Sequence, residues 1–506
     1  MRSTTHPSFG TGITLWPRRY RPALHLAFRS SHPLEFGSCF REHRSRASVG
    51  EIGMPEQKME RHYPKVAALR PRTEGDVPEE GQRQLYLARI VMAEAAAAEA
   101  ARRVPRNPRL VSSTHGEIGR MLLAIPSYAV TDVDGRPNPL AAAYRDLVSK
   151  LGPEVDLEVI THESVEAEVR AWFDADRQGD VHVIAVVDHL HFSVWAEDGY
   201  AIVQDEGAGT PAFVEPFSFP RYGDALLADI VSNHTDMGHS QAPLYFQGGN
   251  LLIGDDFFLI GADYPANSLS YVYQAIIPAP GESPPATVRR LYSEYLDTSR
   301  VMHYVGSTVP VPAQAVRPIT VDGTEWQEIV HFGNKAGTVQ PLFHIDMFIT
   351  LAGRGSDGRY RLLVGDPRMA AQILDVPLWP GAMQEVFDNI ALHLDALGFD
   401  VHRNPLPLTH VDDPADRLRT WYFATSNNAL AQIGSDGTKR VWLPTYGHGA
   451  WSDLARTDEA NREVWQSLGF EVTMLGDFHP FAENLGAVHC IKKYLDRTDG
   501  QGSLPT

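Results

Sequence analysis

Asn250-Leu-Leu-Ile-Gly-Asp-Asp-Phe-Phe-Leu-Ile-Gly261 is the stretch of the chain that decides its fold. Two short apolar runs flank Gly254-Asp-Asp256, whose residues favour tight turns, so the stretch predicts a β-hairpin. Along the rest of the chain, short apolar runs alternate with helical stretches, which is typical of the α/β class. Hairpins mixed with helices fit repeated ββαβ-type modules better than a purely parallel sheet.

The alternation begins after residue 110 and continues toward the carboxyl end. The runs that predict strands are Met121–Ile125, Leu157–Ile160, Val181–Val187, Tyr200–Val203, Leu251–Ile253, Phe257–Ile260, His344–Leu351, Tyr360–Val364, Val441–Leu443 and Glu471–Leu475. Helices are expected at Ser164–Phe173, Pro285–Tyr295, Met383–Leu397 and Asp458–Leu468.

The chain divides into four segments by composition. Residues 1–80 are rich in Arg, Pro, Ser, Gly and His and lack periodicity, so we expect a disordered or artefactual N-terminal extension, with Met54 as an alternative start. Residues 81–110 contain a run of strong helix formers and predict a peripheral helix. Residues 111–497 make the main domain, and residues 498–506 make a C-terminal tail.

Composition narrows the class of protein further. The chain is 43% hydrophobic and 21% charged, as globular proteins are, and it has no apolar run of the roughly 18–20 residues that a membrane span requires. Its two cysteines, Cys39 and Cys490, exclude a disulfide framework and favour a reducing, cytoplasmic location. The net charge of −18 disfavours nucleic acid as a partner and favours cationic ligands.

Cys490 ends the run Gly486-Ala-Val-His-Cys490, and His344-Ile-Asp346 lies far upstream in an apolar stretch. A thiol, an imidazole and a carboxylate are the groups of a covalent thiolate mechanism. If His344–Leu351 is a strand, His344 and Asp346 project from one face, because residues i and i+2 do so. A buried hydrogen-bonded pair without chemistry is the alternative. His489 is expected to point away from Cys490, in a structural role.

Two further polar clusters precede apolar runs. Trp195 and Asp198 come before the predicted strand Tyr200–Val203, and Asp205 follows it; acids and an indole could hold a planar cation. A solvated loop is the alternative. In Gln247-Gly-Gly-Asn250 the two glycines permit tight backbone geometry near a ligand, although many ordinary turns have the same pattern.

These elements, taken in order, resemble the guanidino-group-modifying (pentein) superfamily, which includes agmatine, arginine and protein-arginine deiminases and amidinotransferases. The matching elements are Trp195-Ala-Glu-Asp198, Gln247-Gly-Gly-Asn250, His344-Ile-Asp346, Asn428-Ala-Leu with Leu443-Pro444, and Gly486-Ala-Val-His489-Cys490, which together cover roughly residues 115–495. The chain departs from the family at three places: Gln247 stands where many members have glutamate, Glu197 stands where an arginine is common, and Leu485-Gly-Ala-Val488 stands where a string of glycines precedes the cysteine.

The resemblance implies a five-bladed α/β propeller of ββαβ-type modules with pseudo-fivefold symmetry. It implies Cys490 as the nucleophile, His344 as the general acid and base, and Asp198 and Asp346 as the carboxylates that grip a guanidinium. Asp205 is the alternative to Asp198. Residues expected to bind substrate are Asp205, Trp195, Gln247, Asn250 and Asn428, and for Asn428 a hydrogen-bonding role in the core is the alternative.

The implied function is a deiminase that hydrolyses a guanidinium group to a ureido product and ammonia through a thiouronium on the cysteine. An amidinotransferase that passes the amidino group to an amine, and a non-catalytic guanidine-binding protein, are the alternatives. Peptidyl arginine, free arginine, agmatine and a biosynthetic guanidine are all candidate substrates. The deiminase mechanism needs no metal or cofactor; a zinc site at His189 and His191, with His182 or His344, is a competing interpretation. The chain could form a homo-oligomer.

Overall fold

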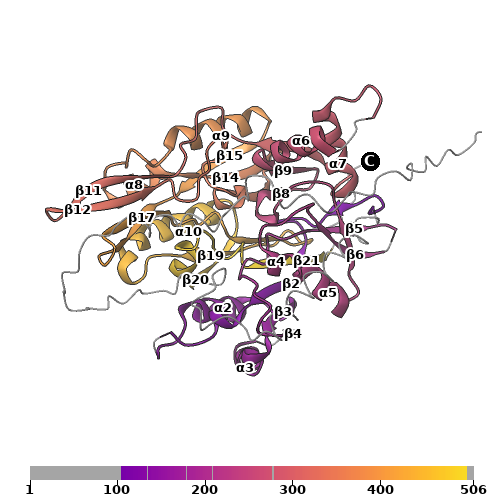
Figure 1. Cartoon of the computed structure of the whole chain (residues 1–506), viewed down its shortest axis with the longest axis horizontal. Helices are drawn as coiled ribbons and strands as arrows, with labels where there is room; N and C mark the ends of the chain where they lie inside the picture. Colours follow the sequence, from indigo (N-terminus) through magenta and orange to yellow (C-terminus); the bar gives the residue numbers. More distant parts are fainter. Residues whose placement is uncertain (1–103, 134, 178, 208, 276–278, 499–506) are drawn as a thin grey trace, which may run out of the picture. The chain divides into compact units, whose positions relative to one another are not determined.

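The computed structural model describes residues 104–133, 135–177, 179–207, 209–275 and 279–498. Its strands form six small sheets with helices beside them, so the predicted mixed α/β class is confirmed (Figure 1). The expected N-terminal extension, most of the expected helix at 81–110 and nearly all of the tail lie outside these residues. The described end of that expected helix, residues 104–110, is not helical and ends in the strand β1 (Arg109–Leu110). No helix within the described ranges is long and apolar enough to cross a membrane.

Five of the six sheets share one connectivity. In each, a first strand pairs antiparallel with a second, and the second pairs parallel with a third that follows intervening helices. The five triplets, in that order of strands, are β5–β6–β7, β8–β9–β10, β13–β14–β15, β18–β19–β20 and β21–β2–β3. Each triplet with its helices is therefore a ββαβ module.

The bounds of the elements in three central modules follow the chain. The first contains β5 (Ala201–Asp205), β6 (Thr210–Glu215), α4 (Tyr222–Ala225), α5 (Leu227–His234) and β7 (Gly238–Gln241), with β1 (Arg109–Leu110) at its edge. The second contains β8 (Leu251–Ile253), β9 (Phe257–Gly261), α6 (Asp263–Ala275), α7 (Pro284–Tyr295) and β10 (Val301–Val305). The third contains β13 (Ile349–Arg354), β14 (Tyr360–Asp366), α8 (Pro367–Leu374), α9 (Gln384–Ala396) and β15 (Asp400–Pro405).

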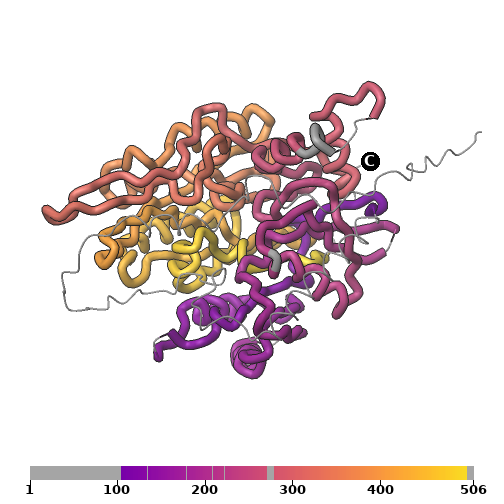
Figure 2. The backbone as a smooth tube through the Cα atoms, viewed as in Figure 1, coloured from indigo at the N-terminus to yellow at the C-terminus, as the bar shows by residue number. Residues whose placement is uncertain are grey.

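The two remaining modules lie at the carboxyl end of the chain and at its junction with the beginning. One contains β18 (Leu430–Ile433), β19 (Lys439–Thr445), α10 (Ala455–Ser467) and β20 (Glu471–Asp477), and the short α11 (His479–Ala482) follows it. The other contains β21 (Lys492–Thr498), β2 (Glu117–Ile125), α2 (Pro139–Lys150), β3 (Asp156–His162), α3 (Glu166–Asp176) and β4 (Val181–Val186). Figure 2 shows this last pairing, in which yellow β21 joins indigo β2.

The predicted hairpin is confirmed at β8 and β9. Leu251 pairs with Ile260 and Ile253 with Phe258, and the backbone of Gly254 closes the turn by donating to the carbonyl of Phe257 at 2.9 Å. All of these apolar side chains are buried, as expected when both faces of a short strand are covered.

The sixth sheet stands outside the repeated pattern. Its order is β11 (Ala315–Val321), β12 (Thr324–Val330), β17 (Leu418–Phe423) and β16 (Leu408–Asp413). The first pair lies between β10 and β13 in sequence, and the second pair lies between β15 and β18. Two insertions between modules thus join into one sheet, which the apolar runs did not predict because β11 and much of β12 are exposed and mix apolar with polar residues.

The candidate site residues share one position in the modules. Asp198 precedes β5, Asn250 precedes β8, Asp346 precedes β13, Asn428 precedes β18 and Cys490 precedes β21. Each segment enters the first strand of a ββαβ module, so one repeated connectivity presents five short polar segments at equivalent points.

The predicted strand His344–Leu351 is wrong at its beginning. Ile345–Met347 is a 3-10 helix, and β13 starts only at Ile349. Asn250 Oδ1 accepts from the backbone N–H of Ile345 at 3.0 Å, and Phe348 donates to the carbonyl of Ile345 at 3.1 Å. These bonds satisfy the buried backbone without a strand partner, so the alternation of strand faces does not apply to His344 and Asp346.

Arg497 provides a test of how β21 is anchored. Its buried guanidinium donates to the carbonyls of Ser113, Thr114, Gly116 and Ala431 at 2.8–3.2 Å. We expect Arg497→Met to lower the free energy of unfolding by about 3 kcal/mol, because it leaves several buried carbonyls without donors. Chemical denaturation measures this change.

The matched control for that measurement is Arg462→Ala, which removes an exposed ion pair with Glu459 on α10. It should leave the denaturation midpoint unchanged, because exposed pairs contribute little. Equal midpoints for the Arg497→Met variant and the parent protein would contradict the anchoring role.

Candidate functional site

Cys490 lies in a turn between α11 and β21, and its thiol is buried and free. Asn428 holds it from two sides: the amide Nδ2 donates to Sγ at 3.1 Å, and Oδ1 accepts from the backbone N–H of Cys490 at 3.2 Å. The same Oδ1 accepts from the backbone N–H of His489 at 2.9 Å. One amide side chain therefore fixes both the position of the sulfur and the backbone that carries it.

The environment of the thiol is anionic. Burial raises the pKa of Cys490 well above its ordinary value, and the neighbouring carboxylates of Asp346 and Asp198 raise it further. The N–H donor of Asn428 acts in the opposite direction. The thiolate is consequently disfavoured until something offsets the two negative charges.

The two carboxylate oxygens of Asp346 differ in their hydrogen bonding. Oδ2 accepts from Asn428 Nδ2 at 2.9 Å and lies 2.8 Å from His489 Nδ1 and 3.7 Å from Cys490 Sγ. Oδ1 is buried and has no hydrogen-bond partner within the described residues. A buried carboxylate oxygen in that state is costly unless a donor or a cation reaches it.

His344 and Asp198 form the opposite side of the same site. His344 Nε2 donates to Gln247 Oε1 at 2.6 Å, because a carbonyl oxygen can only accept. The other ring nitrogen, Nδ1, lies 3.6 Å from Asp198 Oδ1. Both of these facing atoms are buried, and neither has a hydrogen-bond partner in the part of the chain that the structure describes.

Arg221 at the start of α4 holds the remaining oxygen of Asp198. Its Nη2 donates to Asp198 Oδ2 at 2.7 Å, and its Nε donates to Asp224. Asp224 in turn accepts from the backbone N–H and the hydroxyl of Ser193 at 2.6 Å. Although burial alone would lower the pKa of Arg221, the two carboxylates raise it above its usual range. Asp198 is thus oriented by an internal guanidinium and presents only Oδ1 to the site.

Gly249 brings the two sides together. A Cβ at this position would lie 2.6 Å from His344 Nδ1 and 3.2 Å from Asp346 Oδ2. Only a residue without a side chain fits there, so both groups lie against the backbone of the Gln247–Asn250 segment. The site therefore gathers Cys490, Asp346, His344 and Asp198, of which Asp198 and His344 meet through a direct contact.

Three residues that the sequence indicated lie elsewhere or act differently. Asp205 is at the end of β5, where its carboxylate accepts from the backbone of Arg106 and Gly207 at 2.9 and 2.8 Å. Trp195 packs edge-on against Phe481 and covers Gly486, where a Cβ would lie 2.3 Å from its ring. Asn250 holds the backbone of Ile345 and the side chain of Gln340.

His489 differs from expectation. The sequence placed it on the strand face opposite Cys490, but both residues lie in a turn, and its Nδ1 contacts Asp346 Oδ2 at 2.8 Å. Burial lowers the pKa of His489, and the nearby Lys492 lowers it further. A neutral imidazole then donates one hydrogen to Asp346.

Glu197, the residue before Asp198, is paired with two lysines. Its carboxylate lies 2.6 Å from Lys492 Nζ and 2.8 Å from Lys493 Nζ, and all three groups are buried. Burial alone would raise the pKa of Glu197, yet the two ammonium groups lower it to about 2. This cluster joins the segment before β5 to the start of β21.

Sequence reasoning missed Arg221, His489 in its observed role, and the pairing of Glu197. Arg221 follows a proline-containing loop after β6 and has no spacing relation to Asp198. Its contact is tertiary, and no local pattern marks it. The position of His489 next to Cys490 could have indicated a place in the site. It was not used, because a strand would have pointed the two side chains in opposite directions.

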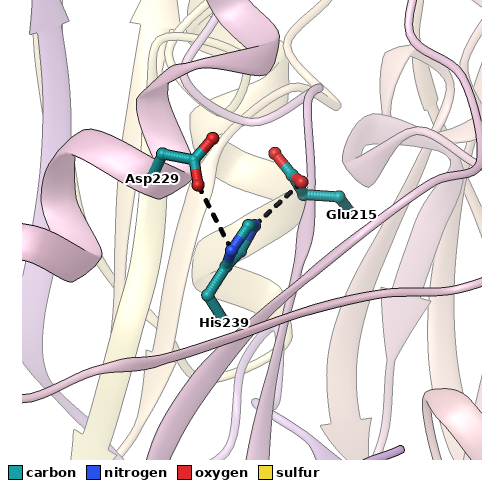
Figure 3. A group of neighbouring side chains, drawn as sticks. All are labelled: Glu215, Asp229 and His239. Atoms are coloured by element: carbon teal, nitrogen blue, oxygen red, sulfur yellow. Dashed lines mark ion pairs between the residues drawn. The ribbon is translucent and has the colours of Figure 1, made fainter. Parts of the chain in front are cut away.

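A second cluster has the composition of a metal site. Glu215, Asp229 and His239 offer ligand atoms within 4.8 Å of one another, and they are the group of this kind that occurs within the described residues (Figure 3). His239 Nε2 lies 2.8 Å from Glu215, and Nδ1 lies 3.3 Å from Asp229. Both nitrogens face carboxylates, and burial raises the pKa of both acids. His189 and His191, the pair considered from sequence, lie in an irregular segment after β4.

Known proteins resemble this chain in fold. No family model matches it, and no curated protein matches it. One crystal structure, provisionally described as a peptidyl-arginine deiminase, is 11% identical with a TM-score of 0.50, over 78% of this chain and 99% of the other. An X-ray structure provisionally described as an agmatine deiminase is 12% identical with a TM-score of 0.50, over 76% and 95%. The resemblance predicted from the motifs is thereby confirmed at the level of the fold.

The amide of Asn428 can be tested through the reactivity of the thiol. In a Cys39→Ser background, Asn428→Asp removes the N–H donor to Cys490 Sγ and adds a charge beside it. The pKa of the thiol should rise further, so the thiolate fraction near neutral pH falls. We expect iodoacetamide to alkylate Cys490 at least about tenfold more slowly, which corresponds to one pKa unit.

Asn233→Asp on the exposed face of α5 makes the same chemical change far from these contacts and serves as the control. It should leave the alkylation rate unchanged. Alkylation of the Asn428→Asp variant at the parent rate would contradict the proposed hold of Asn428 on the sulfur.

Proposed function

We propose that this protein is a guanidine deiminase, which hydrolyses a guanidinium group to a ureido product and ammonia. One observation carries the proposal: among the residues that the structure describes, Asp198 Oδ1, Asp346 Oδ1 and His344 Nδ1 have no hydrogen-bond partner and are buried beside a free thiol. Two carboxylate oxygens and an imidazole nitrogen match a planar cation that is rich in N–H donors. Both fold neighbours are described as deiminases, which agrees with this chemistry.

We further propose that the five ββαβ modules surround this site as the blades of an α/β propeller. Their shared connectivity supports that arrangement, as does the position of each site segment directly before the first strand of its module. A ring of equivalent strand entries would explain why residues nearly three hundred positions apart, Asp198 and Cys490, affect one another.

In the proposed complex, Asp198 and Asp346 accept hydrogen bonds from the substrate guanidinium through their Oδ1 atoms. Arg221 occupies the other oxygen of Asp198, while Asn428 and His489 occupy the other oxygen of Asp346. Each acid is therefore held by the protein on one side and offers the other side to the ligand. Such prior orientation lowers the entropic cost of placing the guanidinium carbon near the sulfur.

The first chemical step forms a bond between Cys490 Sγ and the guanidinium carbon. The tetrahedral intermediate then loses one nitrogen as ammonia, with a proton supplied by His344, and leaves an S-alkylthiouronium on the enzyme. Because Nε2 of His344 is committed to Gln247, Nδ1 is the atom that delivers this proton.

The second step reverses the role of the imidazole. Neutral Nδ1 of His344 takes a proton from water as the oxygen attacks the thiouronium carbon. The carbon–sulfur bond breaks, the ureido product leaves, and Cys490 returns as thiolate. An amine in place of water would make the same intermediate a donor for amidino transfer.

Carboxylate substitutions with a matched control test the substrate grip. Cys490→Ser should abolish ammonia release from guanidino compounds. Asp198→Asn should lower kcat/KM by about a hundredfold or more, because it removes one charged hydrogen-bond acceptor for the cation. Asp205→Asn makes the same change outside the site and should leave kcat/KM unchanged. A loss in Asp205→Asn equal to that in Asp198→Asn would instead assign the grip to Asp205.

The charge environment of the thiol gives a prediction about pH. Since burial and two carboxylates raise the pKa of Cys490, its alkylation by neutral iodoacetamide should keep increasing above the pH at which an ordinary thiol is fully ionised. A cationic haloacetamidine should react much faster near neutral pH, because its charge offsets Asp198 and Asp346. Parallel pH–rate profiles for the two reagents measure the difference. Identical rates at every pH would contradict an anionic guanidinium site.

A further inference from the structure

A recess lined by aromatic and aliphatic side chains lies directly beside the candidate site. Phe343 and Met347, which flank His344 and Asp346, form one wall, and Trp379, Trp421, Leu408 and Leu485 are among the other lining residues. The Phe343 ring is 4.5 Å from the ring of His344. Met347 Sδ lies 3.7 Å from Asn428 Nδ2, which also donates to the sulfur of Cys490. The recess and the reactive group are therefore separated by single side chains.

The recess is lined in part by the sheet that stands outside the repeated modules, and Trp379 comes from the connection between α8 and α9. Leu408, Trp421 and Phe423 come from β16 and β17, and the segment from His331 to Phe343 leads from β12 to His344. β17 ends just before the segment that carries Asn428. β12 pairs with β17 in parallel. The β11–β12 and β16–β17 insertions therefore each lead into a segment that carries a candidate site residue. Elements that select a substrate are expected at such positions.

The chemistry of the lining excludes a charged group. Within the described residues, no aspartate, glutamate, lysine or arginine lines the recess. His331 is its one titratable imidazole, and burial lowers its pKa, with a further decrease from Arg317. An ammonium or carboxylate placed there would lose hydration without gaining a partner of opposite charge.

The two tryptophans give the recess aromatic ring surface, and the polar N–H of Trp421 is bonded to Glu328. Trp379 and Trp421 stack with ring centroids 4.6 Å apart at 22°. Trp421 Nε1 donates to Glu328 Oε2 at 2.7 Å, and Glu328 also pairs with Arg317, whose guanidinium lies 5.0 Å from the Trp379 ring. The surfaces left to the recess suit an uncharged ring.

We propose that this recess binds the substituent of the guanidine substrate, and that this substituent is uncharged and bears an aromatic ring. The inference rests on the proposed deiminase function and assigns its substrate class: arylalkylguanidines in preference to agmatine or arginine. Agmatine would direct its ammonium toward a lining without carboxylates, whereas a phenyl group would be removed from water against the tryptophans.

A matched pair of substrates tests the assignment. Agmatine and 4-phenylbutylguanidine share a four-carbon arm. Agmatine ends in an ammonium group, whereas 4-phenylbutylguanidine ends in a phenyl group. We expect kcat/KM for ammonia release to be at least about tenfold higher for 4-phenylbutylguanidine, since one well-packed group contributes a factor of that order. A preference for agmatine, or equal values, would overturn the assignment. An acetyl-Phe-Arg amide tests a peptide source of the same ring; its preference over the small guanidine would equally overturn it.

The variant Leu408→Glu provides a second test, because it adds a carboxylate to the recess. It should shift the ratio of kcat/KM values at least about tenfold toward agmatine, because the ammonium gains a partner. Val301→Glu, at the exposed first residue of β10, makes a comparable change elsewhere and should leave the ratio unchanged. An unaltered ratio in Leu408→Glu would contradict the recess as the subsite.

Two measurements separate failure of this inference from failure of the deiminase proposal. Methylguanidine has no arm, so ammonia release from it by the parent protein depends on the guanidinium site alone and tests the deiminase proposal without the recess. If no guanidine is hydrolysed, calorimetric binding of 4-phenylbutylguanidine against agmatine to the Cys490→Ser protein still tests the recess. Tighter binding of the phenyl compound supports it, and equal or weaker binding overturns it.

Discussion

Two carboxylates buried beside one thiol are the constraint on which the rest of the structure depends. Asp198 and Asp346 would repel each other and suppress the thiolate of Cys490 if nothing opposed them. The protein provides hydrogen-bond partners for only one oxygen of each carboxylate. Arg221 donates to one oxygen of Asp198, and Asn428 and His489 donate to one oxygen of Asp346. The remaining oxygens keep an electrostatic demand that the proposed guanidinium substrate would meet, so the imbalance that destabilises the free site would provide its affinity.

A frame of repeated modules makes this imbalance tolerable. Each polar segment enters the first strand of a ββαβ unit whose apolar strands are buried, so the segments are held by packing that does not involve their own charges. The buried cluster of Glu197 with Lys492 and Lys493 adds a second link, since it joins the segment of Asp198 to the strand that follows Cys490. Removal of one partner from such a cluster leaves a buried charge, which makes the junction intolerant of change.

Local patterns predicted part of this and missed the rest for physical reasons. The hairpin Asn250–Gly261 follows from turn residues and apolar runs that act over short distances, and it was predicted correctly. The gathering of Cys490, His344 and Asp346 was expected from residue types, but the strand assigned to His344 was wrong, because apolar neighbours are buried equally well in a 3-10 turn. Arg221 was missed because a tertiary ion pair has no sequence period, and the exposed strands of the sixth sheet carry no apolar alternation.

The division between modules and insertions also separates two physical tasks. The polar segments before the module strands must place charges within fractions of an ångström, and short connections to buried strands allow that. Selection among substrates needs only shape and the presence or absence of charge, so it can be carried by the sheet of β11, β12, β16 and β17, whose outer faces are exposed. Because the recess borders the site at Phe343 and Met347 and not at the acids themselves, its lining can change without altering the charge balance around Cys490.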